Sequence, residues 1–271
     1  MAANFIGCHI VRTSLELLHP CQFDPRFSFG LLLPDGAKPR HLLVVVHDST
    51  RQTAPCLNGF ARFANQHHAA VLAPLFPADV LGDGNQDGYK FLIEGDIRYD
   101  RVLDAMVEQA AAATGCASDR WLLHGYSGGG QFVHRYWLLH PWRLRALVIG
   151  APGEVTLLDK DNPWWAGVQD TPERFGVAVD PAAMRRVPTR MLVGDHDTKT
   201  DELSAQPPSR FWPSDDARLT SNRIDRLTTL QCSLDAAGVQ ASFQLMPGAG
   251  HGSGNEQAMA RAAEFFVQHL G

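Results

Sequence analysis

Residues 125–130 read Gly-Tyr-Ser-Gly-Gly-Gly, and this short stretch is the most informative part of the sequence. It follows an apolar run at 121–124 and precedes a segment of helical character at 131–140. At such a turn from strand to helix, Ser127 takes a strained backbone conformation that points its hydroxyl out above the sheet. The flanking glycines let neighbouring backbone pass without a Cβ clash. The pattern also fits a glycine-rich turn with an incidental serine, so other segments must decide between these interpretations.

Two downstream segments carry the residue types that would complete a catalytic triad. Residues 190–197 read Arg-Met-Leu-Val-Gly-Asp-His-Asp, a short apolar strand that runs into an acidic turn. Residues 243–252 read Phe-Gln-Leu-Met-Pro-Gly-Ala-Gly-His-Gly, another strand that ends in a glycine-rich loop with one histidine. Serine, acid and histidine thus follow one another along the chain, each after a predicted strand. This order predicts that the three side chains meet at one edge of a sheet.

On these residues the chain resembles the α/β-hydrolases, from the apolar strand near Leu42 to the final helix. Residues 44–54 and 247–251 are similar to the oxyanion loop and the histidine loop of esterases and polyhydroxyalkanoate-depolymerase-like enzymes. The resemblance implies an α/β fold with a mostly parallel sheet of about eight strands, helices on both faces and a short cap. It also implies a serine hydrolase that needs no cofactor and no metal.

The composition excludes several other classes of function. The formal net charge is −5 and no run of Lys or Arg occurs, which argues against nucleic-acid binding. No stretch approaches eighteen uninterrupted apolar residues, so no membrane span is predicted. Five scattered cysteines and an N-terminus without a secretory pattern favour a reduced, cytoplasmic protein without a zinc site. Phosphatase and dehydrogenase activities have no support, because no P-loop or dinucleotide motif is present.

Apolar runs alternate with helical patterns, which predicts one domain over residues 1–271. Within it we expect a cap-like insertion at about 154–186. We also expect a long loop at about 198–221. It lines the substrate entrance, forms a subunit contact or is a solvent-exposed loop without such a role. The expected strands lie at 5–11, 28–33, 41–46, 70–75, 121–124, 144–149, 190–194 and 243–246. The expected helices lie at 54–66, 97–113, 131–140, 222–237 and 256–270, and 81–88 is a glycine-rich loop.

The triad assigns one role to each residue. Ser127 is the expected nucleophile, and His251 is the base that takes its proton and later delivers it to the leaving group. Asp197 is the expected acid that orients His251, because it stands three residues after Gly194, as in the family. Asp195 is close enough to compete for this role, although it also suits a cap of its own turn.

An oxyanion hole requires two backbone amides aimed at the developing charge. Gly128, directly after the nucleophile, supplies the first, and Ser49 supplies the second by position, with Thr50 as the alternative. The family often has His-Gly before this donor, whereas the chain has Asp48 after His47. This aspartate either repels anionic substrates or turns away to hold the loop.

Five aromatic residues lie nearest the predicted edge of the active site. They either wall an apolar pocket or pack in the core: Phe76, Tyr126, Trp164, Trp165 and Phe211. We expect hydrolysis of a small-molecule carboxylic ester through an acyl-enzyme. An amidase, peptidase, thioesterase or carbon–carbon bond hydrolase would use the same triad, and a ligand-binding homologue without activity is the alternative outside catalysis. The sequence indicates neither the acyl length of the substrate nor the oligomeric state.

Overall fold

The computed structural model describes residues 18–36, 38–200 and 222–271. Among the described residues, eight strands form one sheet in the order β1-β2-β4-β3-β7-β8-β9-β10, in which β2 alone runs opposite to the other strands. The strands are β1 (Leu18–Pro20), β2 (Ser28–Leu32), β3 (His41–Val46), β4 (Ala69–Leu75), β7 (Trp121–Tyr126), β8 (Leu144–Gly150), β9 (Thr189–Gly194) and β10 (Ser242–Met246). A separate short pair is formed by β5 (Ile93–Glu94) and β6 (Ile97–Arg98).

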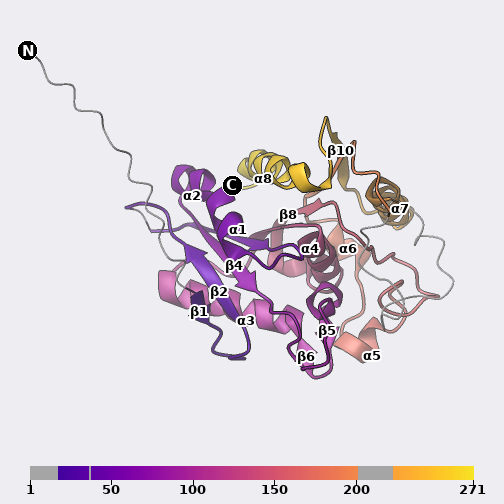
Figure 1. Ribbon diagram of the computed structural model, residues 1–271, viewed down its shortest axis with the longest axis horizontal. Helices are drawn as coiled ribbons and strands as arrows, with labels where there is room; N and C mark the ends of the chain where they lie inside the picture. The colour runs from indigo at the N-terminus through magenta and orange to yellow at the C-terminus, as the bar shows by residue number, and fades with distance from the viewer. Residues whose placement is uncertain (1–17, 37, 201–221) are drawn as a thin grey trace, which may run out of the picture.

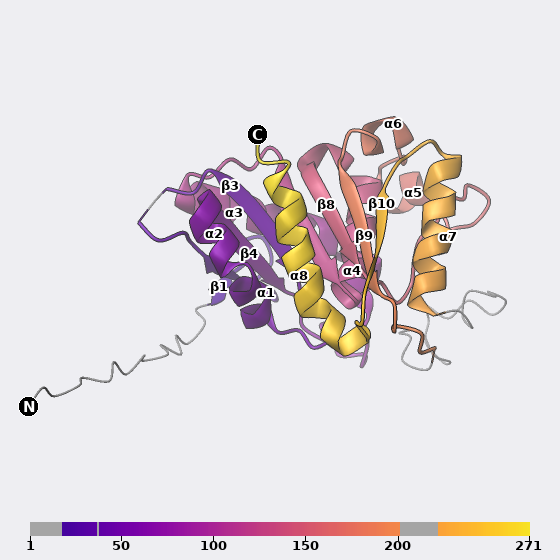
Figure 2. The ribbon, with the colours of Figure 1, turned by 90° about the horizontal axis from the view of Figure 1, so that it is seen from above.

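Helices cover both faces of this sheet, as Figures 1 and 2 show, with α1, α2 and α8 on one face and α3 and α4 on the other. The helices are α1 (Thr53–Gly59), α2 (Ala61–His67), α3 (Tyr99–Thr114), α4 (Gly128–Leu139), α5 (Thr171–Phe175), α6 (Pro181–Met184), α7 (Arg223–Ala236) and α8 (His251–Val267). Two 3₁₀ turns are η1 (Gly88–Phe91) and η2 (Pro141–Arg143). The predicted α/β class and mostly parallel sheet are therefore confirmed.

The core strands form because their apolar runs are buried on both faces of the sheet. In β3, every residue after His41 is buried, and β7 is buried along its whole length. Helix α3 presents its apolar stripe to the sheet and ends at Gly115, whose φ of 69° terminates the helix. Because these central strands run parallel, the ends of β3, β7 and β9 lie at one edge of the sheet.

The structure departs from the predicted elements at Phe60, at the start of the last helix and around the first described strand. The expected helix at 54–66 is two helices, α1 and α2, because the chain breaks at Phe60 and buries its ring against His124. The last helix begins at His251 rather than at 256. The short edge strand β1 was not predicted, and the predicted strand at 5–11 lies outside the described residues.

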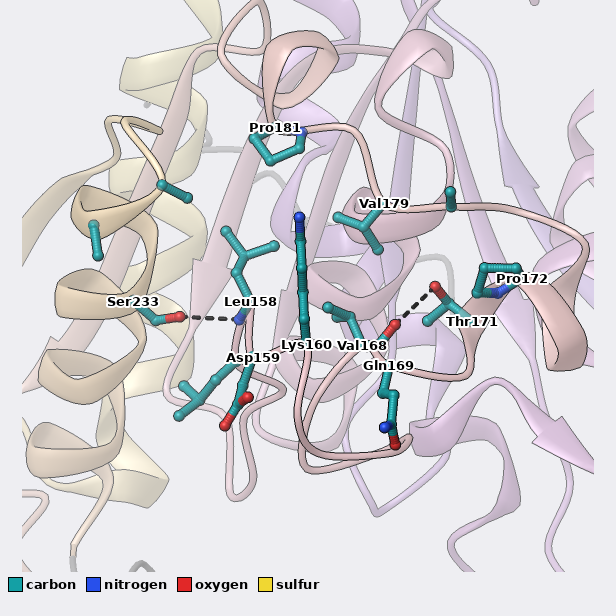
Figure 3. Close-up of a pocket in the computed structure, with 14 residues that line it drawn as sticks. Leu158, Asp159, Lys160, Val168, Gln169, Thr171, Pro172, Val179, Pro181 and Ser233 are labelled. Atoms are coloured by element: carbon teal, nitrogen blue, oxygen red, sulfur yellow. Dashed lines mark hydrogen bonds between the residues drawn. The ribbon is translucent and has the colours of Figure 1, made fainter.

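The cap segment, residues 154–186, contains only the short helices α5 and α6. It packs against α7, where the Ser233 hydroxyl accepts a hydrogen bond of 2.9 Å from the Leu158 amide. Between this segment and α7 lies a cavity of about 750 Å³, shown in Figure 3. Its lining is mainly apolar and includes Leu158, Val168 and Val179.

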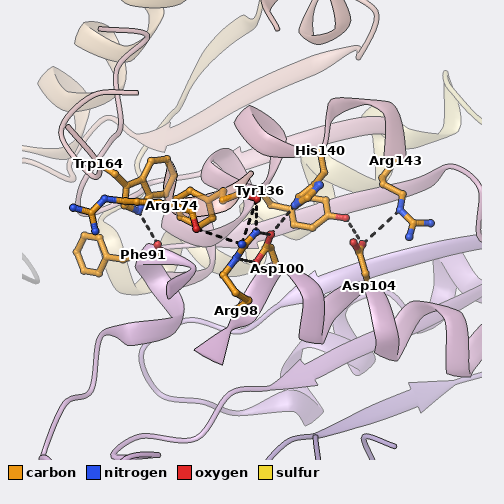
Figure 4. A network of polar contacts seen from close by, with 10 residues as sticks. Phe91, Arg98, Asp100, Asp104, Tyr136, His140, Arg143, Trp164 and Arg174 are labelled. Atoms are coloured by element: carbon orange, nitrogen blue, oxygen red, sulfur yellow. Dashed lines mark hydrogen bonds and ion pairs between the residues drawn. The ribbon is translucent and has the colours of Figure 1, made fainter. Parts of the chain in front are cut away.

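A buried polar network joins α3, α4 and the cap segment (Figure 4). The Asp100 carboxylate accepts hydrogen bonds from Arg98 at 2.7 Å and from His140 at 2.8 Å. Arg98 also donates to the Phe175 carbonyl of α5. Burial raises the pKa of Asp100, but the hydrogen bonds from His140 and Arg98 lower it further, so the pKa lies below its ordinary value. The network therefore anchors the far end of α4, the helix that starts at the nucleophile turn.

Candidate active site

Ser127 occupies the turn between β7 and α4 with a φ of 55°, a conformation that residues other than glycine rarely adopt. Its amide donates to the Gly150 carbonyl at 2.8 Å, and its own carbonyl accepts from the Gln131 amide at 3.0 Å. A Cβ atom at Gly129 would clash with the Val46 carbonyl of β3. The turn therefore needs glycine at position 129, and its strain is maintained by hydrogen bonds on both sides.

His251 connects Ser127 to Asp197. The Ser127 hydroxyl lies 3.0 Å from Nε2 of His251, and Nδ1 lies 2.8 Å from Oδ2 of Asp197. With its proton on Nδ1, the imidazole donates to the carboxylate and accepts from the serine hydroxyl. The three side chains thus form a continuous chain of hydrogen bonds.

Asp195 and Asp197 have different partners. The Asp197 carboxylate is fully buried against His251, whereas the Asp195 side chain is 37% exposed. Oδ1 of Asp195 accepts a hydrogen bond of 2.8 Å from the Gly248 amide. Asp195 therefore ties its turn to the loop before His251, whereas Asp197 is the carboxylate that contacts the imidazole.

Arg223 is a residue of the site that the sequence analysis missed. It is the first residue of α7, and its buried guanidinium donates to Oδ1 of Asp197 at 3.2 Å. Both oxygens of Asp197 are thus bound, one to His251 and one to the Arg223 guanidinium. No local motif marks Arg223, and only its place at the start of a predicted helix after the acid strand could have drawn notice.

Tyr126 supports His251 and does not wall an open pocket. Its hydroxyl donates to the His251 carbonyl at 2.9 Å, and its ring stacks on the imidazole with centroids 5.3 Å apart. The side chain is only 4% exposed. Burial raises the pKa of Tyr126, so the phenol remains a donor at neutral pH.

The other aromatic residues proposed to touch substrate pack inside the protein. The Phe76 ring is fully buried and stacks on Phe132 at 5.1 Å, which assigns it to the core. The Trp164 indole donates to the Phe91 carbonyl at 2.9 Å, and Trp165 packs on the Phe91 ring. Both tryptophans are buried, so they fix the cap segment against η1. Phe211 lies outside the described residues.

Asp48 holds the oxyanion loop together. Its Oδ1 accepts from the amide of Thr50 at 2.8 Å and from the hydroxyl of the same residue at 2.5 Å. The Thr50 amide is therefore engaged, which favours Ser49 as the second donor. The Arg51 guanidinium donates to the Ser49 carbonyl at 2.7 Å and fixes the orientation of that peptide.

The buried side chain of His47 anchors the oxyanion loop to the residue that follows β4. Its Nδ1 donates to the Asp48 carbonyl at 2.7 Å, and its Nε2 accepts from the Phe76 amide at 3.1 Å. These partners require one neutral tautomer. Burial lowers the pKa of His47 to about 4, in agreement with that requirement.

The cavity under the cap segment is not the triad site, because none of the three triad residues lines it. A smaller cavity of about 260 Å³ borders the oxyanion loop at Asp48 and Thr50 and reaches Tyr126.

Among the described residues, no group of three or more His, Cys, Asp or Glu side chains could hold a metal ion. Within the same ranges, no helix is both long and apolar enough to cross a membrane.

No protein-family model matches the sequence, and the search of curated proteins found no relative. Solved structures are similar over most of the chain. A poly(3-hydroxybutyrate) depolymerase from Bordetella parapertussis is 22% identical, with a TM-score of 0.69 over 89% of this chain and 84% of that one. The poly(aspartic acid) hydrolase-1 from Sphingomonas sp. KT-1 is 19% identical, with a TM-score of 0.69 over 89% and 93%.

An S-formylglutathione hydrolase from Agrobacterium tumefaciens is 14% identical, with a TM-score of 0.63 over 94% of both chains. At these identities the likeness establishes the architecture of the chain and leaves its chemistry to the site.

Proposed function

Because the chain has the α/β-hydrolase fold, we propose that it is a serine hydrolase that cleaves a small-molecule carboxylic ester. The observation that carries this proposal is the chain of hydrogen bonds from Ser127 through His251 to Asp197. The similar solved structures include esterases and a poly(3-hydroxybutyrate) depolymerase, which favours an ester as the substrate.

The proposed reaction has two halves. In the first, the Ser127 oxygen bonds to the ester carbonyl carbon while its proton passes to Nε2 of His251. The tetrahedral intermediate collapses, the acyl–alcohol bond breaks, and His251 returns the proton to the departing alcohol. In the second half, His251 takes a proton from water, the resulting hydroxyl attacks the acyl-enzyme, and the acid leaves as Ser127 regains its proton.

The developing negative charge would be held by the amides of Gly128 and Ser49. Gly128 is the first residue of α4, so its amide belongs to the positive end of that helix. Asp197 would stabilise the imidazolium that forms in each half and keep His251 in the required tautomer. Tyr126 would hold the imidazole over the serine through its stacking contact.

A fluorophosphonate probe tests the proposal directly. We expect it to label the wild-type protein at Ser127, and Ser127→Ala to abolish labelling and ester turnover. Ser233→Ala is a matched control, because its hydroxyl binds the Leu158 amide of the cap segment instead. Labelling that persists in Ser127→Ala would reject the assignment.

Amidase, peptidase, thioesterase and carbon–carbon bond hydrolase activities would use the same residues. A p-nitrophenyl ester and the p-nitroanilide of the same acyl group separate an esterase from an amidase or a peptidase. Acyl thioesters test for thioesterase activity. A ligand-binding homologue without activity would turn over none of them.

We also propose one domain in a cytoplasmic setting. Among the described residues, Cys21, Cys116 and Cys232 are free thiols, which agrees with a reducing compartment. Fractionation of cells that express the protein checks the compartment, and a single cooperative unfolding transition checks the domain count.

A further inference from the structure

The side chain of Tyr89 ends in a buried hydroxyl beside the nucleophile turn. Tyr89 belongs to η1, and it is only 1% exposed. Among the residues that the structure describes, its hydroxyl has no hydrogen-bond partner of standard geometry. A buried polar group without a partner destabilises a fold, so its presence calls for an explanation.

This hydroxyl fills the space that a side chain at position 128 would take. A Cβ atom built on Gly128 would clash with the Tyr89 hydroxyl, and it would lie 3.1 Å from the Ser49 hydroxyl oxygen. The phenol therefore lies against the backbone of Gly128 and close to Ser49. These are the two residues whose amides would form the oxyanion hole.

The ring of Tyr89 is fixed on several sides. Its centroid lies 5.0 Å from that of His47 and 5.8 Å from that of Phe76, and the Arg51 guanidinium lies 5.6 Å from it. The backbone next to it is held too, because the Lys90 carbonyl accepts from Arg135 at 2.7 Å. A donor held this firmly needs little reorganisation when charge develops beside it.

We propose that the Tyr89 hydroxyl is a third donor of the oxyanion hole, an inference that rests on the proposed function. As the Ser127 oxygen bonds to the ester carbon, the π electron pair of the carbonyl moves onto its oxygen. The phenol donates a hydrogen bond to this oxyanion and keeps its own proton, while the serine proton goes to His251. Burial raises the pKa of Tyr89, which keeps the phenol protonated throughout.

Lys90 is the rival donor, because its Cε atom would lie 3.1 Å from the same Cβ position. Its ammonium is already bound to Asp87, with Nζ 2.6 Å from Oδ1. The Lys90 ammonium therefore already has an acidic partner, whereas the polar neighbour of the phenol is the neutral hydroxyl of Ser49. Lys90→Met separates the two candidates.

Tyr89→Phe tests the proposal with p-nitrophenyl acetate as substrate and a trifluoromethyl ketone as mimic of the tetrahedral intermediate. We expect kcat/KM to fall about 10- to 100-fold and the Ki of the ketone to rise by the same factor, with KM little changed. Tyr136→Phe is the matched control. Its buried hydroxyl donates to Asp104 at 2.5 Å in α3, so its loss should lower Tm and leave kcat/KM unchanged.

Gly128→Ala gives an independent test, because the added methyl group displaces the phenol while the amide of residue 128 remains. We expect this variant to lose activity, and Tyr89→Phe/Gly128→Ala to be no worse than Tyr89→Phe alone, since both changes remove one interaction. Additive losses would overturn the proposal. Wild-type kinetics in Tyr89→Phe, or a loss of activity that appears only in Lys90→Met, would also overturn it.

Wild-type protein that neither reacts with fluorophosphonate nor cleaves esters would instead reject the proposed function and the role of Tyr89 with it.

Discussion

The guanidinium of Arg223 donates to Oδ1 of Asp197 at 3.2 Å, while Oδ2 of the same carboxylate lies 2.8 Å from His251. Both the Arg223 side chain and the carboxylate are buried, with exposures of 4% and 0%. An ionised carboxylate in such a place needs compensation by charge and hydrogen bonds. Arg223 thus holds the Asp197 carboxylate in place beside His251.

Arg223→Met should therefore leave a buried carboxylate without its cation. We expect the free energy of unfolding to fall by about 3–5 kcal/mol, as when one partner of a buried ion pair is removed. We expect kcat to fall as well, with KM nearly constant, and Arg223→Lys to restore part of both. Urea unfolding and ester kinetics measure these effects. Arg261→Met, which removes an exposed pair with Glu264, is the control and should change stability by at most about 1 kcal/mol.

The two aspartates of the acid turn should differ sharply in their effect on catalysis. Asp197→Asn should lower kcat by about 10⁴-fold, because an amide cannot hold the required tautomer of His251 or stabilise the imidazolium. Asp195→Asn removes at most one hydrogen bond to Gly248 from a partly exposed group, so kcat should stay within a few-fold of wild type. Steady-state kinetics on one ester measure both variants. Comparable losses in the two would contradict the assignment of Asp197.

The sequence predicted those parts of the site that require particular residues locally. The turn at Ser127 needs glycine, and the triad order is fixed by the connectivity of the strands, so Ser127 and His251 could be placed from sequence. Arg223 and Tyr89 could not, because each is brought to the site by packing between segments far apart in the chain.

Burial was harder to predict than position along a strand. Phe76 follows β4, and the sequence left open whether it walls a pocket or packs in the core; its ring is fully buried and stacks on Phe132. Tyr126 likewise contacts His251 from a buried position. A residue at the end of a strand can point to either face, and the surrounding helices decide which face is covered.

Tyr126→Phe should separate the two contacts that Tyr126 makes with His251. The variant loses the hydrogen bond to the His251 carbonyl and keeps the ring on the imidazole. We expect a loss of about 1 kcal/mol in unfolding free energy and a kcat several-fold lower, with KM unchanged. Tyr126→Ala also removes the ring and should lower kcat further. Equal kcat values in these two variants would show that the stacking contact has no part in positioning the imidazole.

The buried His47 predicts how stability depends on pH. Its pKa is about 4 in the folded protein and 6.5 in the unfolded chain, because burial penalises the charged form. Between these values only the unfolded chain binds the proton, so the stabilisation is complete above pH 6.5 and is lost as the pH falls towards 4. The shift corresponds to about 3 kcal/mol. Urea unfolding at pH 7.5 and at steps down to pH 4 should show this loss.

His47→Gln isolates this contribution from that of other groups, including His124, whose pKa burial also lowers to about 4. The glutamine carbonyl can accept from the Phe76 amide in place of Nε2, and the side chain does not titrate. The variant should therefore lose about 3 kcal/mol less stability than wild type between pH 7.5 and 4. Parallel curves for the two proteins would mean that His47 is protonated in the folded state, and the oxyanion loop would then need a different anchor.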